Sequence, residues 1–186
     1  MSSRTLKIIA SLIVFIAVAG AMKQADATLQ NQEIITKIRD KNTQFSALLN
    51  AKSDPEDLMK FMHESIDENA EIYLSVNNTD MKQAEALEVK VSKSEYINSY
   101  LYGPRQVKNY HVDIMTLKVD VEGEQVKTKE ILTETGIIMN LHDYQDKGRD
   151  FTSRTTCESQ HEIVKGGKLS LTHSKCHTDI LYDEAV

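Results

Sequence analysis

Residues 151–182 constrain the fold more than any other stretch of this chain. They form two alternating segments around Gly166-Gly167, and a Gly-Gly pair supplies the positive φ angles of a two-residue hairpin turn. Pairing about that turn sets Cys157 opposite Cys176, Glu158 opposite Lys175, Arg154 opposite Asp179 and Phe151 opposite Tyr182. Cysteines, opposite charges and aromatic residues therefore all indicate one long antiparallel hairpin with one register.

The two cysteines of this hairpin are predicted to form a disulfide. Directly opposed residues in an antiparallel ladder have Cα atoms about 4.5 to 5.5 Å apart, a separation that a disulfide bridges. A Cys157–Cys176 bond would close a loop of about 20 residues, for which the chain-entropy relation gives roughly 3 kcal/mol. The alternative is two free thiols that act as small hydrophobic side chains.

The first 27 residues explain how a disulfide could form. Arg4 and Lys7 precede an apolar run at residues 8–22, and Ala25-Asp26-Ala27 supplies the small residues that a signal peptidase reads. We interpret residues 1–27 as a secretory signal peptide. An uncleaved anchor is the alternative, although the apolar run is shorter than the ~20 residues that span a bilayer.

Without the leader, residues 28–186 have a length that suits a single domain, periplasmic or secreted. The leader contains three basic residues and one acidic residue, so its removal changes the formal charge from -6 to -8. An acidic domain lacks the basic surface that nucleic acid requires, so nucleic acid is not an expected partner. No other segment approaches the length of a membrane span, and we expect no stable span after cleavage.

Hydrophobic periodicity predicts three helices before the long strands. The first covers residues 29–51, with a polar interruption at 40–43 where it could break. The second begins at Ser53-Asp54-Pro55-Glu56, a cap followed by proline in the first turn. The third begins where Ser92 and Glu95 can form a capping box.

The remaining expected elements are strands. Residues 71–76 and 87–91 alternate as two short strands. Residues 107–121 and 125–140 flank Glu122-Gly123 as a second long hairpin. Strands of roughly 14 residues exceed the usual length of about five or six, so the sheet must twist and bend.

This order of elements resembles that of the NTF2-like superfamily, which includes the SnoaL-like polyketide cyclases and ketosteroid isomerase. The resemblance extends from about residue 29 to residue 182. It implies an α+β fold, in which N-terminal helices pack on a strongly curved antiparallel sheet to form a cone with a pocket at its open end. It also implies a homodimer through the outer face of the sheet. The superfamily contains isomerases, cyclases and epoxide hydrolases, and fold alone does not choose among them.

His111 and Asp113 are candidate pocket residues on the strand at residues 107–121, because they continue an apolar row. That row contains Met115, Leu117 and Val119. Beside a pocket mouth, such groups could remove a proton next to a carbonyl if their pKa were tuned near the working pH. The same face could equally be the solvated side of the sheet, with Val112 and Ile114 directed inward.

An enzyme interpretation assigns roles around this face. His111 or Asp113 would be the base, and Tyr73 or Tyr100 would donate a hydrogen bond to the developing oxyanion. Glu130 would add a further carboxylate to the pocket. The register predicted for the second hairpin brings carboxylates to this face by pairing Met115 with Glu130 and His111 with Glu134.

No metal site or cofactor is expected. His173 and His177 would share one face of a helix, but in a strand four residues separate them by about 13 Å. The cysteines are better explained as a disulfide than as zinc ligands. The chain also lacks a Gly-x-Ser-x-Gly elbow, and Gly166-Gly167 lacks the strand-loop-helix context of a phosphate cradle.

Three functions remain open, and the leading one is non-enzymatic: binding of a small apolar ligand or a protein partner in the cell envelope. The second is acid-base chemistry in the cone pocket, as in SnoaL-like proteins or ketosteroid isomerase. The third is a dimeric assembly protein of an envelope complex. Catalysis requires titratable groups in an enclosed cavity, ligand binding requires an apolar pocket without convergent polar groups, and assembly requires an apolar patch on the outer sheet face.

Overall fold

The computed structural model describes residues 29–51, 54–78, 88–138 and 148–182. The chain divides into two compact units, residues 1–37 and residues 38–186. In the first unit residues 29–37 are helical, and Glu33 and Lys37 form an ion pair of 2.9 Å one helical turn apart. The predicted signal peptide lies outside the described residues, and all elements below belong to the second unit.

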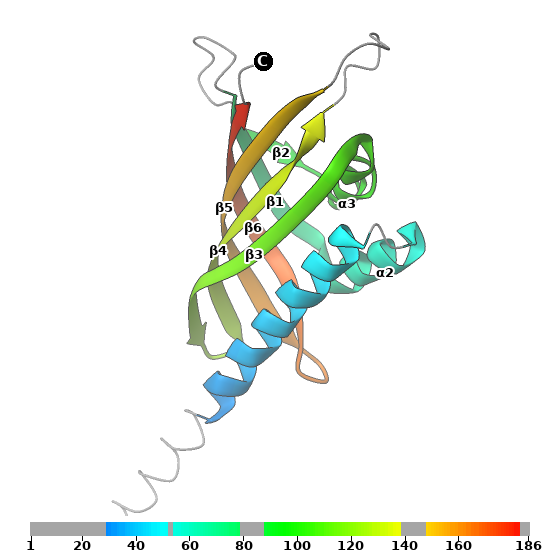
Figure 1. The fold of residues 1–186 in the computed structure, drawn as a ribbon. Helices are drawn as coiled ribbons and strands as arrows, with labels where there is room; N and C mark the ends of the chain where they lie inside the picture. Colours follow the sequence, from blue (N-terminus) through cyan, green and yellow to red (C-terminus); the bar gives the residue numbers. More distant parts are fainter. Residues whose placement is uncertain (1–28, 52–53, 79–87, 139–147, 183–186) are drawn as a thin grey trace, which may run out of the picture. The chain divides into compact units, whose positions relative to one another are not determined.

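The second unit contains a six-stranded sheet with the order β2-β1-β6-β5-β4-β3 (Figure 1). Its strands are β1 (Ile66–Asn78), β2 (Glu88–Val91), β3 (Val107–Glu122), β4 (Gln125–Ile138), β5 (Arg149–Val164) and β6 (Lys168–Tyr182). Neighbouring strands are antiparallel except β1 and β6, which are parallel. The two strands predicted to be short therefore extend the sheet beyond the C-terminal hairpin.

The C-terminal hairpin has the register that its residues predict. Cys157 pairs with Cys176, Glu158 with Lys175, Arg154 with Asp179 and Phe151 with Tyr182. The predicted two-residue turn is wrong, however, because Val164 pairs with Lys168 and leaves a three-residue loop that contains Gly166 and Gly167 at φ 86° and 71°. A register shift between Gln160 and His161 compensates for the extra loop residue.

The second hairpin differs from its predicted register. It turns at Gly123-Glu124, with Glu122 paired to Gln125, and its register shifts twice along β3. As a result Met115 pairs with Ile131 and Thr116 with Glu130, while His111 pairs with Thr135 and Val112 with Glu134. The prediction that Glu130 and Glu134 share a face with His111 is therefore wrong, because a slip of one residue moves a side chain to the other face.

Three α-helical segments and one short 3-10 helix accompany the sheet in the described part of the second unit. Residues 38–50 are helical without a break at 40–43. Helix α2 (Pro55–Ser65) begins after Asp54, whose side chain accepts from the Glu56 backbone N at 3.0 Å. Helix α3 (Lys93–Tyr102) has the predicted capping box between Ser92 and Glu95. A short 3-10 helix, η1 (Pro104–Gln106), leads into β3.

The core lies between these helices and one face of the sheet, called here the inner face. It comprises Leu49, Leu58, Met62, Ile66, Ile72, Ile97, Leu101, Tyr110, Val112 and Leu171. Val112 is 1% exposed, whereas Met115 and Leu117 are 55% and 50% exposed on the opposite, outer face. His111 and Asp113 are also exposed. The row that contains His111 and Asp113 is therefore on the solvated side of the sheet, which is the alternative given by the sequence analysis.

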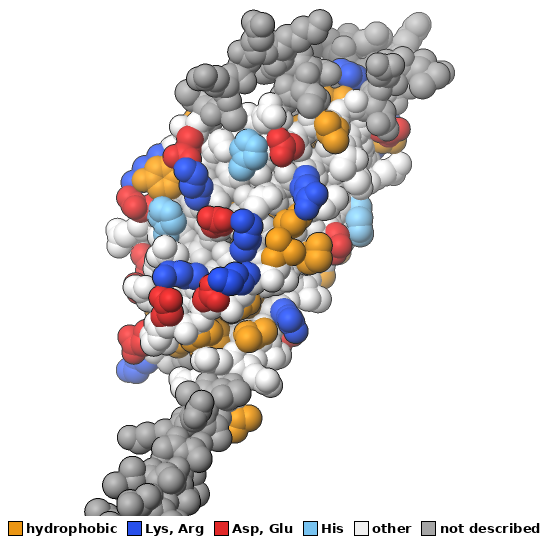
Figure 2. Space-filling view, turned by 90° about the vertical axis from the view of Figure 1, so that its left-hand side faces the viewer, with side chains coloured by type: hydrophobic (Ala, Val, Ile, Leu, Met, Phe, Trp, Pro, Cys, Tyr) orange, Lys and Arg blue, Asp and Glu red, His pale blue; other side chains and the backbone are white. Residues whose placement is uncertain are grey.

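Charged pairs cover much of the outer face. Lys118 pairs with Asp120, Lys127 with Glu122 and Lys129 with Glu158, at 2.6 to 2.9 Å, and Lys175 pairs with Glu88. Figure 2 shows a face of the molecule on which basic, acidic and hydrophobic side chains are intermingled. Most of these pairs are well exposed, so each stabilises the fold by less than about 1 kcal/mol.

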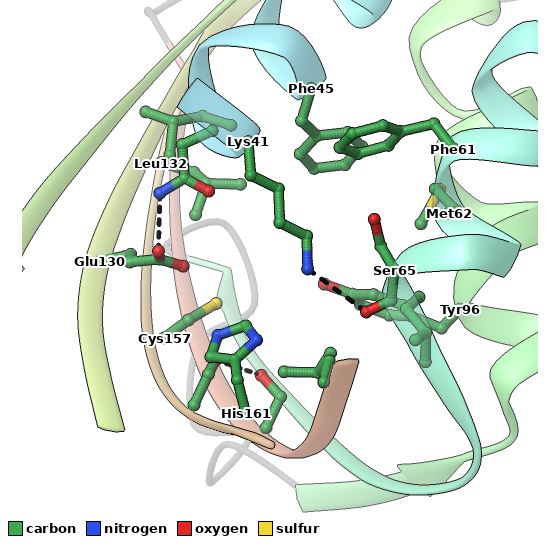
Figure 3. Close-up of a pocket in the computed structure, with 16 residues that line it drawn as sticks. Lys41, Phe45, Phe61, Met62, Ser65, Tyr96, Glu130, Leu132, Cys157 and His161 are labelled. Carbon is green, nitrogen blue, oxygen red and sulfur yellow. Dashed lines mark hydrogen bonds between the residues drawn. The ribbon is translucent and has the colours of Figure 1, made fainter. Parts of the chain in front are cut away.

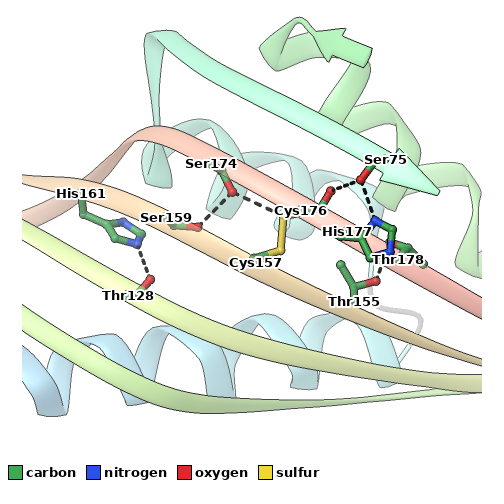
Figure 4. The surroundings of a disulfide bond; sticks show 10 residues. All are labelled: Ser75, Thr128, Thr155, Cys157, Ser159, His161, Ser174, Cys176, His177 and Thr178. Carbon is green, nitrogen blue, oxygen red and sulfur yellow. Dashed lines mark hydrogen bonds between the residues drawn. A yellow bond between two sulfur atoms is a disulfide. The ribbon is translucent and has the colours of Figure 1, made fainter. Parts of the chain in front are cut away.

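A disulfide joins Cys157 and Cys176 across the C-terminal hairpin, with a Cα–Cα distance of 4.1 Å. Both cysteines are buried on the inner face beside Leu132. Figure 4 shows hydroxyl groups around the bond, including a Ser159–Ser174 hydrogen bond of 2.9 Å. In the described part of the chain, no helix is both long and apolar enough to cross a membrane.

Candidate functional site

A cavity of about 80 Å³ lies between the helices and the inner face of the sheet (Figure 3). Phe45, Phe61, Met62, Ile114, Leu132 and Leu171 give it a largely apolar wall. A lysine, a glutamate and a histidine from separate elements also line it: Lys41 from the helix at residues 38–50, Glu130 from β4 and His161 from β5. The cavity therefore combines an apolar surface with convergent polar groups.

Lys41 reaches from its helix into the middle of the cavity, as Figure 3 shows. Its Nζ donates a hydrogen bond to the backbone oxygen of Ser65, the last residue of α2, at 3.3 Å. Burial lowers the pKa of Lys41 from 10.5 to about 8, although the charge of Glu130 partly opposes this change. Near neutral pH the amine is thus mostly charged but titrates within reach of physiological pH.

Hydrogen bonds from Asn50 and Ser46 hold the Lys41 helix against β3 at the edge of the sheet. The Asn50 side chain accepts from Val112 N at 2.7 Å and donates to Val112 O at 2.8 Å. Ser46 Oγ also donates to Val112 O, at 2.9 Å. These bonds satisfy backbone groups that an edge strand would otherwise expose, and they fix the helix face that carries Lys41 toward the cavity.

Glu130 faces the cavity because the observed register of β4 turns it inward. Its Oε1 accepts a hydrogen bond of 2.6 Å from Asn42 Nδ2, and the same amide lies 3.0 Å from Thr116 Oγ1. Burial raises the pKa of Glu130, while the Asn42 hydrogen bond and the Lys41 charge act in the lowering direction. A carboxylate made more basic and held by an amide has the properties of a positioned general base.

His161 is buried beside Lys41 and Glu130 in the cavity wall. Its Nε2 lies 3.5 Å from Thr128 Oγ1, and its Nδ1 has no hydrogen-bond partner among the described residues. Burial and then the Lys41 charge lower the pKa of His161 to about 3, so the imidazole is neutral at physiological pH. One ring nitrogen is therefore left to bond a molecule in the cavity.

Aromatic residues close the cavity on the side of α3. Phe45 stacks on Phe61 with ring centroids 5.8 Å apart, and it meets Tyr100 edge-on at 5.1 Å. Tyr96 lines the cavity and packs edge-on against Tyr100 at 5.2 Å. Burial raises the pKa of both tyrosines, which remain protonated donors. Tyr96 and Tyr100 also line an adjacent cavity of about 190 Å³.

The structure brings together only part of the predicted pocket. Glu130 lines the cavity, and Tyr100 lines the adjacent one. His111 and Asp113 lie on the outer face, away from Glu130. Tyr73 packs at 5.6 Å from the ring of His173, with Lys90 Nζ also 5.6 Å from its ring centroid.

His173 and His177, two further histidines of the described residues, lie outside this cavity. His173 Nδ1 is 3.9 Å from Glu71 Oε2, and His177 Nδ1 is 2.8 Å from Ser75 Oγ. Within the described ranges, no three His, Cys, Asp or Glu residues are grouped so that they could hold a metal ion.

Sequence reasoning missed Lys41, Asn42 and His161, although the first two left a signal. Lys41 and Asn42 follow Ile38 by three and four residues and precede Phe45 by four and three. This is the spacing of the buried face of a helix. The polar interruption at 40–43, where the predicted helix could break, contains the two side chains that enter the cavity.

No family model matches the sequence, and no curated protein matches it. A conserved protein from Planctomyces limnophilus is similar in structure, with a TM-score of 0.58, 9% identity, and coverage of 82% of this chain and 99% of that chain. A putative scytalone dehydratase from Novosphingobium aromaticivorans has a TM-score of 0.58 and 12% identity, over 86% and 93% of the two chains.

A hexachlorocyclohexane dehydrochlorinase, LinA type 2, gives a TM-score of 0.57 and 6% identity, with coverage of 86% of this chain and 95% of that chain. At such identities the likeness concerns the fold and not the chemistry. The neighbours have helices packed against a curved, mostly antiparallel sheet, as does the described part of this chain. The element order predicted from the sequence is confirmed, and this protein has an NTF2-like, SnoaL-like α+β fold.

Proposed function

We propose that this protein is an exported acid-base enzyme that removes a proton next to the carbonyl group of a small, mainly apolar substrate. One observation carries the proposal: Lys41, Glu130 and His161 come from three separate elements and converge on one largely apolar cavity. Simple binding of an apolar ligand requires a pocket without convergent polar groups. This cavity has the features expected for catalysis instead.

In this proposal the Lys41 ammonium binds the carbonyl oxygen of the substrate. An ammonium has three donor hydrogens, and the Ser65 carbonyl accepts one of them. The others are available to a bound oxygen, whose negative charge grows as the proton leaves. In a site without bulk water, such a donor stabilises the transition state more than it would in solution.

Glu130 is the base, and Asn42 positions it. A general base works best when its pKa lies near the working pH, and burial raises the pKa of Glu130 in that direction. The 2.6 Å bond from Asn42 fixes one carboxylate oxygen and leaves the other to take the proton. Neutral His161 offers its Nδ1 to a further polar group of the substrate.

The dimensions of the cavity limit the substrate. Its volume of about 80 Å³ is well below the roughly 300 to 1,000 Å³ of pockets for drug-sized ligands. The substrate is therefore a small carbonyl compound, held by the Phe45 and Phe61 rings. The names of two structural neighbours, a putative dehydratase and a dehydrochlorinase, support the compatibility of this fold with catalysis.

The envelope-assembly interpretation has less support. Assembly through the outer face would use a broad apolar patch, but Met115 and Leu117 lie on a face crossed by ion pairs such as Lys118–Asp120. Export is supported by the leader pattern at residues 1–27 and by a disulfide, which persists in oxidising compartments.

The test is exchange of α-protons in D2O, with cyclopentanone, cyclohexanone and butanal as probes, followed by proton NMR. The wild-type protein should accelerate loss of the α-proton signal, and Glu130→Gln should lower the rate by roughly 100-fold or more, the usual contribution of a general base. Asp113→Asn is the matched control, because Asp113 is an exposed carboxylate on the neighbouring strand.

Asp113→Asn should exchange at the wild-type rate. The proposal fails if the folded wild-type protein exchanges none of the three probes faster than buffer. It also fails if the Asp113→Asn variant loses as much activity as Glu130→Gln.

A further inference from the structure

We propose that Lys41 forms a covalent imine with its substrate, so that the substrate class is an aldehyde or an unhindered ketone. This inference rests on the proposed function, because the same cavity holds the same carbonyl group. It changes the role of Lys41 from a charged donor to a nucleophile. The position of its amine, the neighbouring proton carriers and the apolar wall of the cavity support it.

The Lys41 amine is placed for attack on a bound molecule. Figure 3 shows its Nζ between the stacked Phe45 and Phe61 rings on one side and Glu130 and His161 on the other. Its bond to Ser65 O, at 3.3 Å, is longer than the usual N–H···O bond of about 2.9 Å. Glu130 acts on Lys41 through its charge and not through a hydrogen bond. Among the described residues, the amine is thus not held in a tight ion pair.

The reactive form of a lysine is its neutral amine, and burial favours that form. An exposed lysine with an ordinary pKa is neutral at pH 7 in roughly one molecule of several thousand. With a pKa lowered by burial to about 8, Lys41 is neutral in roughly one molecule in ten at the same pH. Desolvated lysines of this kind are the ones that form Schiff bases.

The cavity supplies the proton transfers that condensation requires. The Nζ lone pair adds to the carbonyl carbon and the carbonyl π electrons move to oxygen. The Glu130 carboxylate takes one proton from the nitrogen and passes it to that oxygen, which gives a neutral carbinolamine. Glu130, protonated again from solvent, then protonates the carbinolamine hydroxyl; the C–O bond breaks, water leaves, and the nitrogen lone pair forms the C=N bond. Amine, carbonyl and one solvent proton become a protonated imine and water, without oxidant or reductant.

The imine explains why acid-base groups surround a lysine. A protonated imine withdraws electrons from the α-carbon more strongly than a neutral carbonyl does. Glu130, returned to its carboxylate form, then removes the α-proton and leaves an enamine. Asn42 keeps the carboxylate oriented through both steps. The apolar wall limits access of water, which would otherwise hydrolyse the imine.

The experiment is reductive trapping of wild-type protein with butanal and cyanoborohydride at pH 7.5, followed by mass mapping of the modified lysines. Lys60, an exposed lysine on α2, is the internal reference. Although Lys41 is buried, burial lowers its pKa to about 8, and it should be alkylated at least about tenfold faster than Lys60. Labelling of Lys41 at or below the Lys60 rate overturns the imine.

A second variant separates this inference from the proposed function. Lys41→Arg keeps the positive charge but cannot form an imine, so it should lose α-proton exchange if the imine is required. Exchange that persists in Lys41→Arg, without trapping in the wild type, overturns the imine and leaves the acid-base enzyme standing. Trapping at Lys41 without any α-proton exchange would support the imine and overturn the acid-base enzyme. If Lys41→Arg does not fold, trapping of the wild type decides alone.

Discussion

At the scale of single residues, the cavity is notable because its polar groups reduce stability. The buried Lys41 ammonium, with one hydrogen bond to the residues that the structure describes, loses more hydration than the protein returns. His161 likewise leaves a buried nitrogen without a partner among the described residues. Groups that oppose folding in this way mark the places where a sequence departs from the rules of a well-packed core, and such places are commonly functional.

The Lys41 amine makes stability depend on pH. Its pKa is about 8 in the folded chain and near 10.5 when unfolded, so between these values the unfolded chain binds more protons and stability rises with pH. Relative to Lys41→Met, the wild type should gain about 3 kcal/mol as pH rises through this window. Urea unfolding of both proteins from pH 7 to pH 11 measures the gain, and a constant difference would contradict it.

At the scale of elements, register decided what could be predicted. The register of the C-terminal hairpin was predictable because its disulfide, charge and aromatic pairs all agree on one pairing. The register shift between Gln160 and His161 lies between these pairs and the turn, so it leaves them unchanged. In the β3–β4 hairpin only the turn residues indicated a register. The two register shifts along β3 are not marked by any residue pattern in the sequence. The error in the predicted register placed Glu130 on the outer face of the sheet, so its neighbours in the cavity were not predicted. A register slip of one residue moves a side chain from one face of the sheet to the other.

The shift near the start of β3 can be tested at Asn109. This residue has a φ of 51° and lies between the two paired positions where the register changes. Asn109→Gly should retain full stability, because glycine adopts this conformation freely. Asn109→Val should cost roughly 1 to 2 kcal/mol, the penalty for a β-branched residue in the left-handed region. Urea unfolding distinguishes them, and equal stability of the two variants would argue against this bulge.

The disulfide should stabilise the C-terminal hairpin by restricting the unfolded chain. Its loop of about 20 residues corresponds to roughly 3 kcal/mol, so a Cys157→Ala, Cys176→Ala double variant should unfold at a correspondingly lower urea concentration. Reductant should destabilise the wild type by a similar amount and leave the double variant unchanged. A wild type indifferent to reductant would mean that the cysteines do not hold this hairpin.

At the scale of the whole molecule, the fold was predictable and the site was not. Helix and strand order follow from local periodicity and capping, which a sequence displays directly, and they suffice for an NTF2-like fold. The cavity depends on which residues of distant strands meet. Lys41 and Glu130 are brought together by tertiary packing, and nothing local in the sequence connects them.

Export is a prediction about the entire chain. When the full sequence is expressed with a bacterial secretion system, the released protein should begin at residue 28, because Ala25-Asp26-Ala27 resembles a cleavage site. Its intact mass should also be lower by two hydrogens than after reduction. Retention of the full-length chain in the membrane fraction would instead favour the uncleaved anchor.

Both proposals require that Lys41 enters the cavity as a titratable amine beside Glu130. The most direct measurement is an NMR pH titration of the lysine side chains in protein labelled with ¹³C-lysine, with the Lys41 signal assigned by its absence from Lys41→Met. Because burial lowers the pKa of Lys41 to about 8, we expect this signal to titrate near pH 8. A Lys41 midpoint near 10.5, like that of an exposed lysine, would contradict the site and both proposals built on it.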